Sequence, residues 1–411
     1  MKITRIILIL SVSVILFSPL ITSCKKAEQN TNYSYFVSKK LIVDYNQGFI
    51  NSLLDVASGS VPEITAIKPL VKSDIKVYKL IYKTTINGTE INASGLICVP
   101  STPGNYPVLS FQNGTNTVNA DAPSNNPVNF NYQLVEFIAS TGYIVVIADY
   151  PGFGESSQIP HPYLISDPTV RSLVDMLYTV KEIGNSEFPG ITLKNEFYLL
   201  GYSQGGWATL ALHKALELDY SGDFNLAGSS CGAGPYSILQ LLEGMINEST
   251  YPVPAYLAYI ANAYSAYNQF TNPLGDIFNE PYASRVNSLF TGMLSLDQID
   301  SQLTTSITGL INAEFISGFM TSARYSSLRD ALNNNSVAAW HTYKPVLLTH
   351  GGNDTQVNPA STDNMYNAMI QAGTSQNIIK KVIIPGFDHG DGILPCMLQG
   401  ILFLNNLNNS K

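Results

Sequence analysis

The sequence predicts an α/β fold: a mostly parallel sheet flanked by helices, with a helical insertion that forms a cap. Two observations predict it. Short, continuous apolar runs alternate with helical patterns, which is typical of parallel strands that are buried on both faces and joined by helices. Between Gly232 and Trp340 no buried strand is apparent. About 110 residues are too many for a loop in a compact domain, so we expect this stretch to be helical.

The first predicted elements form a hairpin. Residues 75–85 alternate between apolar and polar side chains, and residues 90–99 return as the partner strand. Asn87-Gly88 between them is the strongest short hairpin signal. The same patterns predict buried strands at residues 107–111, 143–148, 196–200, 226–230, 346–349 and 379–384, and helices at residues 43–56, 131–141, 169–182 and 204–220.

These elements divide the chain into five predicted segments. A lipoprotein signal peptide (1–24) precedes a tether and N-terminal segment (25–60). The core then comes in two parts (61–231 and 341–411) on either side of the helical cap (232–340). No internal repeat is visible.

The composition favours a globular protein outside the cytoplasm and excludes nucleic acid as a partner. Hydrophobic residues make up 45% of the chain, charged residues only 13%, and the net charge is −8. Nucleic-acid binding depends on neutralising phosphates with Lys and Arg, and this chain has an acidic excess. It also has no basic run that would bind a membrane surface electrostatically.

The N-terminus predicts export and a lipid anchor. Lys2 and Arg5 precede an apolar run (6–20) that is shorter than the ~20 residues of a membrane span and typical of a signal peptide. Leu-Ile-Thr-Ser-Cys at residues 20–24 resembles a bacterial lipobox, in which Cys24 is acylated and becomes the first residue. We therefore expect a protein anchored to a membrane of the bacterial cell envelope. An ordinary secretion signal or an uncleaved anchor is the alternative.

The remaining cysteines, Cys98, Cys231 and Cys396, are odd in number and allow at most one disulfide. Cys231 and Cys396 both follow predicted strands near the same end of the sheet, so they form one candidate pair. Three buried free thiols are the equally open alternative. No metal-binding spacing such as Cys-x-x-Cys occurs, and we expect neither a metal nor a cofactor.

A catalytic serine is predicted at Ser203. The run from Gly201 to Gly205, Gly-Tyr-Ser-Gln-Gly, follows the strand at 196–200 and opens the helix at 204–220. Gly-x-Ser-x-Gly in that context is a nucleophile elbow, whose glycines are needed because the turn is tight and lies against neighbouring backbone. The serine is thereby held at a helix N-terminus, where backbone N–H groups favour negative charge.

The base is chosen from five histidines. With such an elbow the triad follows in the chain order Ser, acid, His, which excludes His161. His213 lies in the helix after the serine and is expected on its surface, and His341 precedes the next strand. His389 follows the last strand through a Pro-Gly turn and is the predicted base. His350 is expected to pack near the acid.

The predicted acid is Asp354, on the loop after the strand at 346–349. It would hold the imidazole tautomer and stabilise the imidazolium. An Asx-turn aspartate is the alternative for this residue. Asp388 and Asp391 flank the base and are rivals, but neighbours on a tight loop rarely reach the far ring nitrogen.

An oxyanion hole is predicted from two loops. One donor is the backbone N–H of Gln204, and the other comes from Asn113 and Gly114, after the strand at 107–111. Each donor of this kind contributes about 2.7–4 kcal/mol of transition-state stabilisation. A plain Asn-Gly turn is the alternative.

With these motifs in place, the chain from about residue 75 to 405 resembles the α/β-hydrolase superfamily, and within it the secretory lipases with their large helical lid. The resemblance rests on Phe-Gln-Asn-Gly-Thr at 111–115, Asp-Tyr-Pro-Gly-Phe-Gly-Glu-Ser at 149–156, Gly-Tyr-Ser-Gln-Gly-Gly at 201–206 and His-Gly-Gly-Asn-Asp at 350–354. It implies an α/β-hydrolase fold and hydrolysis of esters or acylglycerols. That branch often has His at the position of Asn113, so the side-chain partner of this loop differs here.

The expected function is therefore a secreted, lipid-anchored serine hydrolase that cleaves a small-molecule ester or lipid. Tyrosines of the cap either line an acyl pocket or serve plain packing: Tyr251, Tyr256, Tyr259, Tyr264 and Tyr267. A serine exopeptidase, with cap acids such as Glu243, Glu248, Asp276 and Glu280 reading a free amino terminus, is one alternative. An esterase removing acetyl or feruloyl groups from polysaccharide and a non-catalytic binding lipoprotein are the others.

Overall fold

The computed structural model describes residues 33–59 and 61–410. The predicted signal peptide with Cys24 and the first part of the predicted tether, residues 25–32, lie outside the described residues. Within them, no helix has the length and apolar character needed to cross a membrane.

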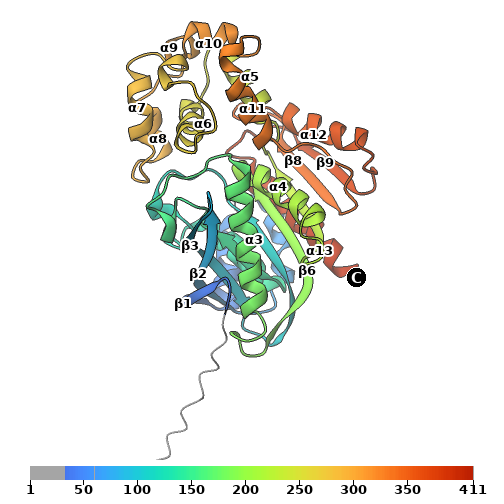
Figure 1. Ribbon diagram of the computed structural model, residues 1–411. Helices are drawn as coiled ribbons and strands as arrows, with labels where there is room; N and C mark the ends of the chain where they lie inside the picture. The colour runs from blue at the N-terminus through green and yellow to red at the C-terminus, as the bar shows by residue number, and fades with distance from the viewer. Residues whose placement is uncertain (1–32, 60, 411) are drawn as a thin grey trace, which may run out of the picture. The chain divides into compact units, whose positions relative to one another are not determined.

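One sheet organises the described chain (Figure 1). Its strands are β1 (Phe36–Tyr45), β2 (Ile75–Ile86), β3 (Thr89–Pro100), β4 (Gly104–Gln112), β5 (Ile144–Ala148), β6 (Ile191–Tyr202), β7 (Asn225–Gly232), β8 (Val346–Gly351) and β9 (Ile379–Ile384). Their order across the sheet is β1-β2-β3-β5-β4-β6-β7-β8-β9. The strands from β5 to β9 in this order are parallel, whereas β1, β2 and β3 form an antiparallel edge. The predicted mostly parallel sheet is confirmed.

Helices cover the sheet between these strands. They are α1 (Gln47–Ser58), α2 (Phe130–Glu136), α3 (Ser166–Ile183), α4 (Gln204–Leu218), α12 (Ala360–Gln371) and α13 (Ile393–Asn409). Buried side chains of α1, α2 and α13 share one hydrophobic cluster with the central strands. Helices α3 and α4 pack against each other and lie in front of the sheet in Figure 1.

The predicted helical insertion between β7 and β8 is confirmed. It contains α5 (Ile238–Asn247), α6 (Pro254–Ala266), α7 (Tyr282–Leu289), α8 (Leu296–Asp300), α9 (Ile307–Leu310), α10 (Ala313–Gly318) and α11 (Ser326–Asn335). In Figure 1 these yellow and orange helices gather beyond one end of the sheet. The phenol groups of Tyr251, Tyr259 and Tyr264 donate hydrogen bonds to backbone carbonyls of core loops. Plain packing and docking therefore account for these cap tyrosines.

The N-terminus differs from the prediction. Residues 36–45 form the edge strand β1, paired with β2, so the sheet begins inside the segment predicted as a tether. The helix predicted at 43–56 begins instead at Gln47, where the side chain of Asn46 accepts from the N–H of Phe49 as an N-cap. An edge strand has little burial to impose a pattern, and Leu41 and Ile42 are indeed exposed. The predicted hairpin at Asn87-Gly88 is present with positive φ at both residues, as its turn type requires.

Cys98, Cys231 and Cys396 are buried free thiols, so the candidate disulfide between Cys231 and Cys396 is excluded. Burial raises the pKa of the Cys396 thiol to about 12. These residues act as small hydrophobic side chains in the core.

A buried carboxyl group predicts an unusual pH dependence of stability. The side chain of Glu136 is fully buried, and neither oxygen has a hydrogen-bond partner among the described residues. Burial raises its pKa to about 8, whereas an unfolded glutamate titrates near ~4.3. Between these values the folded state holds a proton that the unfolded state has released. The free energy of unfolding therefore falls as pH rises through this window.

Glu136→Gln should remove that penalty. We expect the variant to be more stable than wild type by an amount that grows from pH 5 to pH 8, reaching a few kcal/mol, and then levels off. Urea unfolding of both proteins at pH 5, 7 and 9 measures the difference. Parallel pH profiles for the two proteins would contradict the assignment.

Candidate active site

Ser203 occupies a tight turn between β6 and α4. Its backbone has φ 60° and ψ −124°, a conformation that residues other than glycine rarely adopt. A Cβ atom added at Gly205 would lie 1.9 Å from the carbonyl oxygen of Gln112, and one at Gly201 would lie 2.4 Å from the carbonyl oxygen of Gly205. Both glycines are therefore required by the surrounding backbone. The N–H of Ser203 donates to the carbonyl of Gly232 at 2.8 Å, which fixes the turn to the next strand.

The structure brings Ser203, His389 and Asp354 together from three separate loops. Ser203 Oγ lies 2.8 Å from His389 Nε2, and His389 Nδ1 lies 2.6 Å from Asp354 Oδ2. All three side chains are buried. The imidazole is thus bonded at both nitrogens, with a hydroxyl on one side and a carboxylate on the other.

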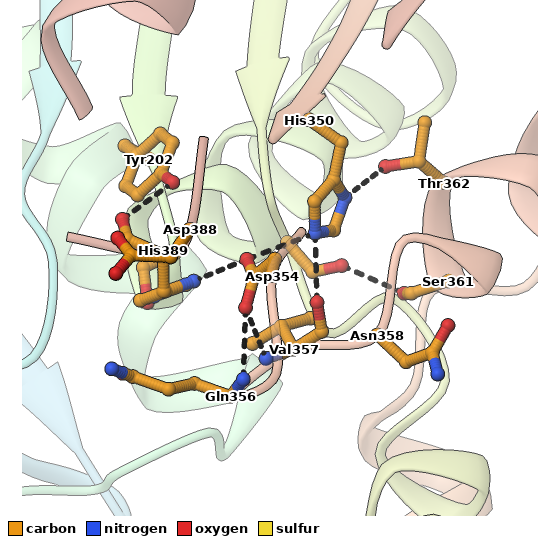
Figure 2. Close-up of polar contacts among 12 residues, drawn as sticks. Tyr202, His350, Asp354, Gln356, Val357, Asn358, Ser361, Thr362, Asp388 and His389 are labelled. Carbon is orange, nitrogen blue, oxygen red and sulfur yellow. Dashed lines mark hydrogen bonds and ion pairs between the residues drawn. The ribbon is translucent and has the colours of Figure 1, made fainter. Parts of the chain in front are cut away.

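Asp354 receives hydrogen bonds on both oxygens (Figure 2). Its Oδ1 accepts from the N–H groups of Gln356 and Val357, both at 2.9 Å. Its Oδ2 accepts from His389 and also from His350, at 3.1 Å. Burial alone would raise the pKa of Asp354, but the hydrogen bonds from His350 and His389 outweigh it and hold that pKa well below its usual range. The carboxylate therefore stays ionised.

His350 lies beside the acid, as expected, and does more than pack. Its Nε2 is 2.8 Å from the carbonyl oxygen of Val357, which can only accept, so Nε2 carries the proton and is shared with Asp354. Its Nδ1 then accepts from the hydroxyl of Thr362 at 2.8 Å. This second imidazole donor to Asp354 was not predicted from the sequence, where only the spacing of four residues between His350 and Asp354 pointed to it.

The other candidates lie elsewhere. His213 was predicted on a helix surface, which is wrong: it is fully buried and bonded to Ser229 Oγ at 2.6 Å and Thr342 Oγ1 at 3.0 Å. Helix α4 is buried on nearly all sides. Its sequence therefore has no polar face that would distinguish an exposed histidine from a buried one. The two rival acids are hydrogen-bonded to each other within one loop, where Asp388 Oδ1 accepts from the N–H of Asp391.

The predicted oxyanion residues surround Ser203. Gln204 is the first residue of α4, so its N–H has no carbonyl one helical turn before it to bond. Gly114 is close enough that a Cβ added there would lie 3.8 Å from the Cβ of Ser203. Among the described residues, no acceptor is found for the N–H of Gly114. Asn113 is buried, and its Oδ1 has no partner in the described chain.

A cavity of about 420 Å³ opens at Ser203 and His389. Polar side chains line one further part of it: Asn113, Thr115, Asn116, Asp121, Asn129 and Asn131. The rest of the wall is aliphatic and aromatic and comes from segments far apart in the sequence: Leu54, Ile64, Ile67, Val135, Phe137, Ile138, Leu394, Met397, Leu398 and Ile401. Of the five cap tyrosines considered in the sequence, Tyr256 alone lines this cavity. The acyl-pocket interpretation of the tyrosine-rich cap is therefore wrong for the other four. Within the described residues, no group of three potential ligands could hold a metal ion.

Comparisons with known proteins give a family and several structural relatives. A family model for secretory lipases matches residues 124–390. The rice cell wall degrading esterase LipA from Xanthomonas oryzae, in a ligand-bound form, has 26% identity and a TM-score of 0.76, covering 90% of this chain and 97% of that one. A Legionella pneumophila protein reaches a TM-score of 0.81 at 23% identity, covering 91% and 98%.

Candida antarctica lipase A in its closed state has a TM-score of 0.63 at 16% identity, covering 86% of this chain and 77% of that one. Among curated proteins, none matches the chain. The structural likenesses show that the fold is the predicted α/β-hydrolase fold.

Proposed function

Because the chain belongs to the secretory lipase family, we propose that it is a serine hydrolase that cleaves carboxylic esters. The observation that carries the proposal is the hydrogen-bonded line from Ser203 through His389 to Asp354 at the mouth of an apolar cavity. The esterase name of the Xanthomonas relative supports the ester bond as the target.

The reaction follows from the positions of these groups. His389 Nε2 takes the proton of Ser203 as Oγ attacks the ester carbonyl, and the N–H groups of Gln204 and Gly114 stabilise the oxyanion. His389 then gives its proton to the departing alcohol, leaving an acyl-enzyme. A water molecule, deprotonated by the same nitrogen, attacks the acyl carbon. His389 then returns this proton to Ser203 Oγ as the carboxylic acid is released. Throughout, Asp354 holds Nδ1–H and stabilises the imidazolium.

The cavity favours an aliphatic acyl chain as the group bound. Its wall is mainly aliphatic and aromatic, and among the described residues Asp121 is the one acidic residue that lines it. The acids Glu243, Glu248, Asp276 and Glu280, which a peptidase reading an amino terminus would use, do not line it. An acetyl group would contact little of this wall. We therefore place the exopeptidase and the acetyl esterase behind a hydrolase of longer acyl esters, while a feruloyl esterase, whose acyl group is larger and aromatic, stays an alternative.

The preferred chain length provides the test. Each methylene buried in the cavity contributes about 0.8 kcal/mol, so kcat/KM should rise about fourfold per methylene until the cavity is filled. A panel of p-nitrophenyl esters from two to sixteen acyl carbons, with aminoacyl anilides beside it, measures this. Cleavage of the anilides without cleavage of the esters would overturn the proposal.

Filling the cavity should shorten the preferred chain. Ile67 lines the aliphatic wall on the segment after α1, so Ile67→Trp should abolish activity on long esters while short esters are still cleaved. Val56 on α1 is 68% exposed and does not line the cavity, so Val56→Trp is the matched control and should leave the profile unchanged. The same profile in both variants would mean that acyl chains bind elsewhere.

We also propose that the protein is exported and anchored in the cell envelope through acylated Cys24, which gives it access to lipid or small ester substrates. The secretory nature of the family supports the export step. Metabolic labelling with radioactive palmitate should mark the wild-type protein and not Cys24→Ser. Equal labelling of the two, or none, would remove the anchor from the proposal.

A further inference from the structure

We propose that Tyr150 and His161 are positioning residues that hold the two halves of the oxyanion hole in place, an inference that rests on the proposed function. Both belong to the segment between β5 and α3. Neither lines the cavity at Ser203, so neither is placed to touch the substrate.

His161 holds the half of the hole that belongs to the nucleophile turn. Its Nδ1 is 2.8 Å from the carbonyl oxygen of Pro151, which can only accept, so Nδ1 carries a proton. Burial lowers the pKa of His161 to about 4, so the ring is neutral and Nε2 is an acceptor. That nitrogen accepts from the side-chain amide of Gln204 at 2.8 Å. Gln204, whose backbone N–H is one of the two proposed oxyanion donors, is thus held in place through its own side chain.

Tyr150 holds the other half. Its hydroxyl donates to the carbonyl oxygen of Asn113 at 3.1 Å, in a buried position. The C=O of Asn113 and the N–H of Gly114 belong to one planar trans peptide and therefore point in opposite directions. A hydrogen bond on this carbonyl consequently fixes the direction of the Gly114 N–H. That N–H belongs to the residue packed against Ser203.

The loop is built around His161. Gly152 has φ +93°, and a Cβ added there would lie 2.5 Å from the Cα of His161. Tyr150 itself has φ 65°, a strained value for a bulky residue. The rings of Phe153 and Tyr259 pack against the imidazole with centroids 5.0 and 5.7 Å away. Such strain persists only where the surrounding structure imposes it. Here the strained loop places His161 to bond Gln204 and Tyr150 to bond Asn113, one hydrogen bond for each half of the hole.

Two variants remove these bonds, and the first does so with almost no change of volume. Tyr150→Phe deletes one hydroxyl, and His161→Asn keeps a donor near Nδ1 but has no acceptor where Nε2 lies. Tyr143→Phe is the matched control, since this buried phenol bonds Asn405 at 3.3 Å and does not line the active-site cavity. The readouts are kcat and KM on a p-nitrophenyl ester, the thermal midpoint, and inhibition by a trifluoromethyl ketone. The adduct of that ketone with Ser203 places an oxyanion in the hole.

Misplaced oxyanion donors should lower kcat about 10- to 100-fold and leave KM within about twofold. The ketone should bind more weakly by the same factor as kcat falls. Tyr143→Phe should match wild type in all of these. Should His161→Asn fail to fold, Tyr150→Phe decides the question alone.

Two results would overturn the inference. If the variants match Tyr143→Phe, or if their KM rises with kcat unchanged, the loop is structural only and the ester-hydrolase proposal stands. If the wild-type protein itself cleaves no ester, both proposals fall together.

Discussion

Ser203→Ala is expected to lower kcat on esters by about 10⁶-fold, because it removes the atom that attacks the carbonyl and the partner of His389. Residual turnover would come from the oxyanion donors acting on water. KM should change little, because the acyl chain binds to the aliphatic wall and not to the serine. Initial rates on p-nitrophenyl esters measure the loss, and covalent labelling by a fluorophosphonate should disappear with it.

Ser172→Ala is a suitable control for this experiment. Ser172 is as deeply buried, and its hydroxyl donates only to the carbonyl of Thr169 within the same helix. It should retain wild-type rates and labelling. If Ser203→Ala kept activity within tenfold of wild type, the nucleophile would have to be a different residue.

The parallel part of the fold could be predicted because burial on both faces leaves a continuous apolar pattern, as in residues 144–148 of β5. The turn at Ser203 could be predicted because its glycines are imposed by backbone approaches that no side chain can share. Strand β1 could not, since one of its sides pairs with β2 and its side chains are mainly exposed or half-buried. A strand of that kind has no periodicity that separates it from a helix start.

Much of the site could be predicted for a topological reason. The carboxyl ends of parallel strands lie at the same edge, so loops after β6, β8 and β9 must meet, and Ser203, Asp354 and His389 follow these strands. The walls of the cavity could not be predicted, because α1, η4 (Phe137–Thr141) and α13 come together only in the folded chain. The buried network of His213 escaped for the same reason, since its partners lie on β7 and beyond the cap.

Asp354→Asn should lower kcat by about 10⁴-fold without a comparable change in KM. The carboxylate accepts on both oxygens, from two backbone N–H groups on Oδ1 and from His350 and His389 on Oδ2. An asparagine keeps one acceptor oxygen. The N–H groups of Gln356 and Val357 belong to the backbone and cannot change direction. The carbonyl oxygen of the asparagine should therefore accept from them, and its NH₂ group should face the imidazoles.

That orientation inverts the tautomer of His389. With an N–H donor opposite Nδ1, the ring must carry its proton on Nε2, where it can no longer accept the proton of Ser203. The same NH₂ group also faces the N–H of His350, which has the carbonyl of Val357 as its other acceptor. Fluorophosphonate labelling should slow by the same factor as kcat. Asp391→Asn changes an exposed rival of the acid and should leave both rates at wild-type values. Loss of activity in Asp391→Asn, with Asp354→Asn unaffected, would show that Asp391 is the acid of the triad.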